Sequence, residues 1–101
     1  MNQLIPQNIL QTLPDLYATS GDLDPICHVK LFTPDSNWTW YVIEFSQDNN
    51  DTLYTYAEGI ENELGYSSLS EIESVRGSLN LPVERDLSFV PTPFSKIKKA
   101  V

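Results

Sequence analysis

Two neighbouring runs of β-branched and aromatic residues constrain the fold of this 101-residue chain most strongly. Residues 27–33 and 38–46 both have the composition of β-strands. Between them, Pro34 suits the second position of a type I turn, and Asn37 tolerates the left-handed conformation that follows such a turn in a short hairpin. The two runs therefore predict an antiparallel hairpin, with the second strand at the centre of a sheet.

The second run is apolar on both faces of the strand it predicts. One face carries Trp38, Trp40 and Val42, and the other carries Tyr41, Ile43 and Phe45. Two tryptophans in a small domain are expected in its core. Strict alternation places Glu44 on the tryptophan face, where a carboxylate must lie at the end of the sheet or pair with a cation. We expect an ion pair there, with ligand binding as the alternative; the candidate cations are Lys30, Arg76 and Arg85.

Shorter patterns indicate the other elements. Apolar spacing after Pro6 predicts a helix over 6–13. A polar turn precedes a third strand over 52–58, which continues the meander. Ser68 and Glu71 have the spacing of a capping box that begins a helix over 69–76, and Gly77 stands at the position of its C-cap.

The remaining segments complete one small domain. Residues 58–66 have no clean period and predict a mobile or functional loop, 87–90 a short edge strand, and 94–101 a terminal helical turn. The predicted fold is α+β: a small antiparallel meander sheet of three to four strands, with two or three short helices packed on one face. We expect a single domain over 1–95 and a basic C-terminal tail over 96–101.

The charge distribution narrows the classes of partner. Fourteen acidic residues against six basic ones give a net charge of −8, and no lysine or arginine lies between Lys30 and Arg76. The negative electrostatic potential of such a chain repels phosphate groups, so direct nucleic-acid binding is not expected. A basic protein surface would instead be attracted. The residues predicted to form the acidic surface are Asp48, Asp51, Glu58, Glu61 and Glu63.

No motif indicates a reaction, a metal or a cofactor. Cys27 and His28 are neighbours on a predicted strand, so their side chains point to opposite faces and cannot form a nucleophile pair. One cysteine and one histidine do not make a zinc site, and the acidic turn at 47–51 lacks the pattern of a calcium loop. Glycine-rich phosphate loops are also missing. We predict no catalytic residues, no metal and no cofactor.

The sequence also gives an expectation for location. No stretch has the roughly 18 to 20 apolar residues that a membrane crossing needs. The first residues lack the basic start of a secretory signal, and a single cysteine cannot form an internal disulfide. We therefore expect a cytoplasmic protein without membrane contact, and the sequence leaves its oligomeric state open.

Six blocks of the sequence resemble a bacterial family of small domains of unknown function. In order along the chain they are HVKLFTP (28–34), WTWY (38–41), ELGY (63–66), SLSE (68–71), VRG (75–77) and LPVERD (81–86). The resemblance extends over about residues 4–93, and residues 46–62 depart from the family pattern. Members are found mainly on plasmids, phages and integrative elements. The resemblance thus implies a cargo protein of mobile DNA, with no established activity and no catalytic residues.

These observations leave three hypotheses for function. The first is a non-enzymatic binding or accessory protein of a mobile element that presents an acidic face to a basic protein partner. The second is a pocket for a nucleotide or metabolite, with enzymatic activity open. That pocket is predicted to be built from Tyr41, Glu44, Tyr66, Arg76 and Arg85. The third is a DNA-mimic inhibitor of a restriction or defence nuclease, which requires carboxylates spaced like phosphates.

Overall fold

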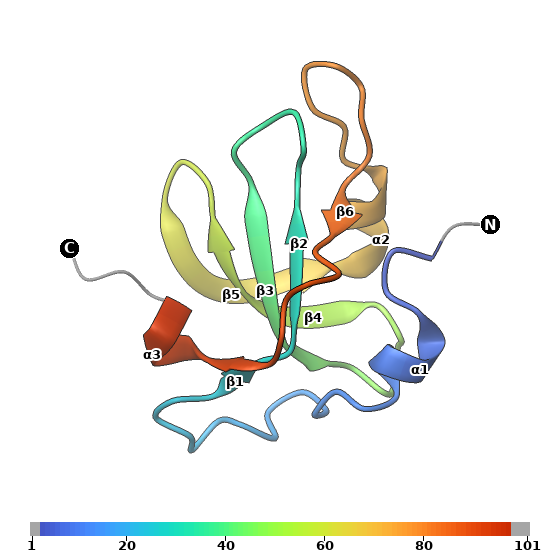
Figure 1. The fold of residues 1–101 in the computed structure, drawn as a ribbon. Coiled ribbons are helices and arrows are strands. Elements are labelled where there is room, and N and C mark those ends of the chain that lie inside the picture. The colour runs from blue at the N-terminus through green and yellow to red at the C-terminus, as the bar shows by residue number, and fades with distance from the viewer. Residues whose placement is uncertain (1–2, 98–101) are drawn as a thin grey trace.

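The centre of the protein is an antiparallel sheet of five strands (Figure 1). The computed structural model describes residues 3–97. The strands of the sheet, in spatial order, are β5 (Asn62–Ser68), β4 (Thr52–Glu58), β3 (Thr39–Phe45), β2 (Val29–Phe32) and β6 (Glu84–Arg85). A second, two-stranded sheet pairs β1 (Ile26–Cys27) with β7 (Thr92–Pro93). The helices are α1 (Gln7–Leu10), α2 (Leu69–Ser74) and α3 (Phe94–Ile97).

The α+β class and the central hairpin are confirmed, but the sheet is larger than predicted. The additional strand is β5, which pairs with β4 over its whole length, from Asn62 beside Glu58 to Ser68 beside Thr52. The prediction of a loop over 58–66 is therefore wrong for residues 62–66. On the side that faces the core, β5 carries glutamate, glycine and serine, so it lacks the apolar alternation by which a half-buried strand is recognised.

A β-bulge at Ile43 reverses the faces of β3. Val42 pairs with Thr55 and Glu44 with Tyr54, so Ile43 is an extra residue without a partner on β4. Beyond the bulge, Phe45 joins Trp40 and Val42 in the core, whereas Glu44 turns to the opposite face. The prediction that Glu44 shares a face with the tryptophans is wrong for this reason.

Helices lie on both faces of the sheet, not on one as predicted. Leu10 of α1, together with Leu69 and Ile72 of α2, packs into the main core with the apolar residues of β2, β3 and β4. On the opposite face, Phe94 of α3 contacts Tyr56 edge to face, with ring centroids 5.0 Å apart. Both faces of the central strands are therefore covered, which explains why β3 is apolar on both sides.

The capping of α2 is confirmed at its start and differs at its end. The Ser68 hydroxyl accepts a hydrogen bond from the Glu71 amide, and Asp51 accepts one from the Ser70 amide and one from the Ser68 hydroxyl. The helix ends at Ser74, and Val75 is extended, so Gly77 is not the C-cap. Gly77 instead lies against Asp35, where a Cβ would come within 1.8 Å of the carboxylate.

Other boundaries also differ from the prediction. α1 covers four residues of the predicted 6–13, because the chain turns after Leu10. Residues 87–90 form a turn at 87–88 and no strand, and the short edge strand is β6 instead. α3 confirms the start of the predicted terminal turn, whereas 98–101 lie outside the described residues. No helix within residues 3–97 has the length and apolarity to cross a membrane.

We predict that Gly77→Ala destabilises the protein by about 1–3 kcal/mol, because the new methyl group requires the Asp35 carboxylate to move. That carboxylate accepts hydrogen bonds from the Leu79 and Leu81 amides, so its displacement leaves both donors unpaired. Urea denaturation measures the effect. Gly21→Ala is the matched control, because the space around Gly21 is open. Equal midpoints for the two variants would contradict the prediction.

Candidate functional site

All five tyrosines of the chain gather on the sheet face opposite the main core, and we call this side the tyrosine face. Cross-strand pairing aligns Tyr41 with Tyr56 and Tyr54 with Tyr66. Tyr17 reaches the same face from the loop before β1, with its ring centroid 6.2 Å from that of Tyr66. Phe89 and Phe94 cover the other end, against Tyr41 and Tyr56 respectively. The face is therefore a second, aromatic layer of the protein.

Glu44 holds the loop 15–25 onto the tyrosine face. Its side chain is buried, and its two oxygens accept hydrogen bonds from the Tyr17 amide at 2.8 Å and the Thr19 amide at 2.9 Å, and from the Thr19 hydroxyl. Tyr17 adopts a left-handed main-chain conformation with φ of 70°, which is uncommon for a bulky residue. Main-chain donors therefore satisfy this buried carboxylate in place of the cation that the sequence predicts.

The five residues predicted to form one ligand pocket lie in separate places. Glu44 and Tyr66 line a hollow of about 280 Å³ beneath the loop 15–25. Arg76 and Arg85 line a different hollow, of about 500 Å³, beside the N-terminal segment. Tyr41 lines neither of these hollows.

Both arginines make contacts that stabilise the fold. The Arg76 guanidinium donates hydrogen bonds to the carbonyls of Glu73 and Val75, at the end of α2. The Arg85 Nε donates to the Leu4 carbonyl, which ties the N-terminal segment to β6. These bonds occupy part of the donor capacity that an anionic ligand would need.

Tyr41 lies between aromatic rings and a cation. Its ring packs against Tyr56 and Phe89, and the Lys30 ammonium lies 5.9 Å from the ring centroid. Burial, and then the charge of Glu58, raises the pKa of the Tyr41 phenol above its usual value. The phenol therefore stays protonated at neutral pH and is not available as a general base.

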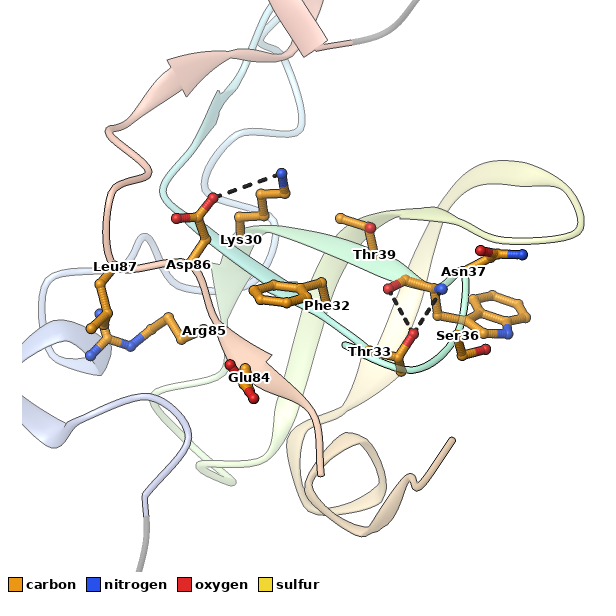
Figure 2. A pocket seen from close by; sticks show the side chains of 11 residues that line it. Lys30, Phe32, Thr33, Ser36, Asn37, Thr39, Glu84, Arg85, Asp86 and Leu87 are labelled. Atoms are coloured by element: carbon orange, nitrogen blue, oxygen red, sulfur yellow. Dashed lines mark hydrogen bonds and ion pairs between the residues drawn. The ribbon is translucent and has the colours of Figure 1, made fainter. Parts of the chain in front are cut away.

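Another hollow, of about 680 Å³, opens beside β2 and is shown in Figure 2. Phe32 lies at its centre, with Glu84, Asp86 and Lys30 on one side and Thr39 and Asn37 on the other. Lys30 and Asp86 form an ion pair of 3.8 Å. The hollow thus offers an aromatic side chain and two cations, of which Lys30 is paired with Asp86 and Arg85 donates to the Leu4 carbonyl.

Cys27 and His28 do not form a reactive pair. Cys27 is fully buried, and burial raises the pKa of its thiol to about 12, so the thiolate is not formed at neutral pH. Burial also lowers the pKa of His28. Among residues 3–97, no three histidine, cysteine, aspartate or glutamate side chains gather in an arrangement that could hold a metal.

Half of the carboxylates hold loops in place. Those that accept hydrogen bonds from amides or hydroxyls are Asp15, Asp22, Asp24, Asp35, Glu44, Asp51 and Asp86. Aspartate has a short side chain, which can reach neighbouring main-chain donors in turns. These carboxylates stabilise their own loops, so their negative charge is a poor indicator of a binding surface.

The predicted acidic residues divide between the two ends of β4. Asp48 and Asp51 lie in the turn before the strand, and Asp51 caps α2. Glu58, Glu61 and Glu63 surround the β4–β5 connection at the other end, roughly 20 Å away for a strand of this length. Within residues 3–97 the side chains of these three glutamates make no hydrogen bond or ion pair.

The β4–β5 connection, part of the predicted functional loop, also exposes an apolar side chain that is not among the predicted site residues. Ile60, at its tip, is 93% exposed, and Trp38 of the neighbouring β2–β3 connection is 37% exposed. The Trp38 ring lies so close to Gly59 that a Cβ there would overlap it. We call this group of Trp38, Glu58, Ile60, Glu61 and Glu63 the acidic tip. The sequence signal for this site is an isolated isoleucine, Ile60, between Gly59 and Glu61 in a polar turn.

A family model described as a protein of unknown function, DUF2958, matches residues 4–99. The chain belongs to this family. The predicted resemblance to a family of unknown function is thereby confirmed, and the association with mobile elements stays a prediction. Searches among curated proteins and among solved structures found no match.

We predict that Glu44→Gln destabilises the protein by about 1–3 kcal/mol, because an amide cannot accept from the Tyr17 and Thr19 donors with both of its polar atoms. Hydrogen exchange at the Tyr17 and Thr19 amides should accelerate more than exchange in β3. Glu63→Gln is the matched control, because that side chain is exposed on β5. If both variants have the same stability, the role assigned to Glu44 is wrong.

We predict that Asp51→Asn lowers stability at pH 7 and weakens the loss of stability in acid. Hydrogen bonds from the Ser68 hydroxyl and the Ser70 amide hold the pKa of Asp51 below its usual value of 3.8. A depressed folded-state pKa contributes stability that is present above the unfolded value and lost as the pH falls through the folded value. Denaturation between about pH 2 and pH 7 tests this, with Asp48→Asn, in the same turn, as the control that should follow the unsubstituted protein.

Proposed function

We propose that this protein is a non-enzymatic accessory protein that binds a basic protein partner through the acidic tip. The supporting observation is Ile60, a fully accessible apolar side chain surrounded by three carboxylates that have no partner within residues 3–97. An apolar centre within a charged rim is the arrangement by which protein interfaces combine affinity with specificity. The cargo role on mobile DNA is proposed from the resemblance of the six sequence blocks.

The acidic tip is better suited to this role than the other free carboxylates. Glu73 and Glu84 share a hollow with Arg76 and Arg85, so cations reduce the field there. No lysine or arginine lies between Lys30 and Arg76 in the sequence, and the tip lies within that stretch. The β4–β5 hairpin also projects from the body of the fold beside the β2–β3 hairpin (Figure 1). A protruding group of one charge can approach a partner without steric hindrance.

The two alternative functions receive less support from the geometry. A single ligand pocket would need its five predicted residues together, but Glu44 and Tyr66 line one hollow, the two arginines line another, and Tyr41 lines neither. A DNA mimic would need many free carboxylates in a row, and half of the carboxylates accept hydrogen bonds from their own loops. The proposal therefore rests on a small surface and not on the overall net charge.

We predict that neutralising the acidic tip strongly reduces the capture of a basic partner. The variant carries Glu58→Gln, Glu61→Gln and Glu63→Gln, and the control, with the same net charge, carries Glu71→Gln, Glu73→Gln and Glu84→Gln. Immobilised protein is exposed to a bacterial lysate at about 50 mM and about 500 mM salt, because screening weakens contacts between exposed charges. The unsubstituted protein and the control should retain the same basic protein at low salt only.

The purified partner then allows a quantitative test. Three exposed charge pairs together contribute roughly 1–2 kcal/mol, so the tip variant should weaken binding about tenfold or more. Ile60→Ser should weaken binding without altering its dependence on salt. Equal affinity of the tip variant and the control, or retention that does not depend on salt, would show that the acidic tip is not the binding surface.

A further inference from the structure

The sheet has one long open edge. β5 pairs with β4 on one side, and within residues 3–97 no strand pairs with its other side. The strand has seven residues, with neither proline nor lysine, two of the residues that natural proteins use to protect an edge against pairing, and Glu63 is its one charged residue. At the other edge, β6 has only two residues. The main-chain donors and acceptors of the alternate β5 residues that are not bonded to β4 are therefore available to another strand.

The side chains along β5 indicate what that strand could be. Leu64 and Tyr66 lie on the tyrosine face and are 43% and 57% exposed. Glu63, Gly65 and Ser67 lie on the other face, and a Cβ at Gly65 would meet nothing within 4 Å. The apolar pair is placed symmetrically about Gly65, the middle residue of the strand.

We propose that β5 pairs in antiparallel fashion with β5 of a second copy of this chain, about a twofold axis at Gly65. In this register Asn62 lies opposite Ser68 of the second copy, and all seven residues pair. The two sheets join into one continuous sheet of ten strands. Such a pairing supplies about six to eight main-chain hydrogen bonds.

The register is complementary in chemistry as well as in length. Leu64 lies opposite Tyr66 of the second copy, and an aromatic ring against an aliphatic side chain is a favourable cross-strand pair. Glu63 lies opposite Ser67 of the second copy, whose hydroxyl can donate to the carboxylate. A twofold axis at Glu63 would instead place two carboxylates opposite each other, which is unfavourable. The axis at Gly65 also leaves Glu58, Ile60 and Glu61 of each acidic tip beyond the ends of the paired segment, whereas Glu63 lies within it.

Paired substitutions on the tyrosine face test this register. The unsubstituted protein should have twice the monomer mass of 11.5 kDa in light scattering at about 100 μM. The double variant Leu64→Lys with Tyr66→Lys places lysines opposite lysines and should be monomeric. The double variant Leu64→Lys with Tyr66→Glu places lysine opposite glutamate at both positions, and should dimerise about tenfold more tightly than the first variant. Leu87→Lys, on an exposed residue distant in the sheet order, should leave the dimer intact.

Cysteine cross-linking tests the position of the axis independently of side-chain energetics. Gly65→Cys brings two thiols face to face across the axis and should form a disulfide-linked dimer under mild oxidation. Ser67→Cys, on the same face, lies opposite residue 63 and should remain unlinked. The native Cys27 is buried and does not interfere. A monomer at all concentrations up to about 200 μM, or a dimer that the Ser67→Cys variant cross-links and the Gly65→Cys variant does not, overturns the proposal.

The dependence on salt separates this proposal from the proposed function. Two copies with a net charge of −8 repel each other, so added salt should strengthen the dimer. Binding of a basic partner at the acidic tip should weaken with salt. If the unsubstituted protein dimerises but retains no basic partner at low salt, the acidic tip alone is refuted. If it retains such a partner but stays monomeric, the β5 pairing alone is refuted.

Discussion

The extra residue at Ile43 determines how the central strand divides its side chains between two layers. Without the bulge, Phe45 would face the tyrosines, and Glu44 would lie among the apolar side chains of the main core. With the bulge, Phe45 is fully buried beside Val42, and its amide donates to the Pro14 carbonyl. Glu44 then faces the loop 15–25, whose amides satisfy it. One inserted residue thus places Phe45 in the main core and places Glu44 where it holds the loop 15–25 over the opposite face.

The distribution of carboxylates shows why net charge is a coarse guide to function. Six of the seven aspartates accept hydrogen bonds from turns, caps and loops, as Asp35 does from the Leu79 and Leu81 amides. Six of the seven glutamates, all except Glu44, make no such contact within residues 3–97. A longer side chain loses more conformational entropy when it is fixed, so aspartate is the better residue for holding a loop. The charge available to a partner is therefore mainly that of the glutamates.

The sequence predicts what depends on neighbouring residues and misses what depends on distant ones. The central hairpin and the start of α2 follow from local composition and capping chemistry, and the structure confirms both, although Asn37 does not have the left-handed conformation expected after the turn. The bulge depends on how β4 pairs with β3, and β5 is hidden because an exposed edge strand needs no apolar alternation. The local pattern predicts Gly77 at a helix end. In the structure Gly77 contacts Asp35, which is distant in the sequence and leaves no room for a side chain. The sequence predicts the three glutamates of the acidic tip as surface residues, but Ile60 is not among the predicted site residues.

The two edges of the sheet differ, and the difference limits how copies of this protein can associate. β6 is short, and Arg85 binds the N-terminal segment there, so this edge offers little main chain to another molecule. A protein with two open edges can add copies without end, whereas one open edge related by a twofold axis closes after two. The asymmetry therefore permits a sheet-to-sheet dimer while it prevents a fibre. In such a dimer two acidic tips would belong to one rigid body, so a partner with two basic sites would bind more tightly than one with a single site.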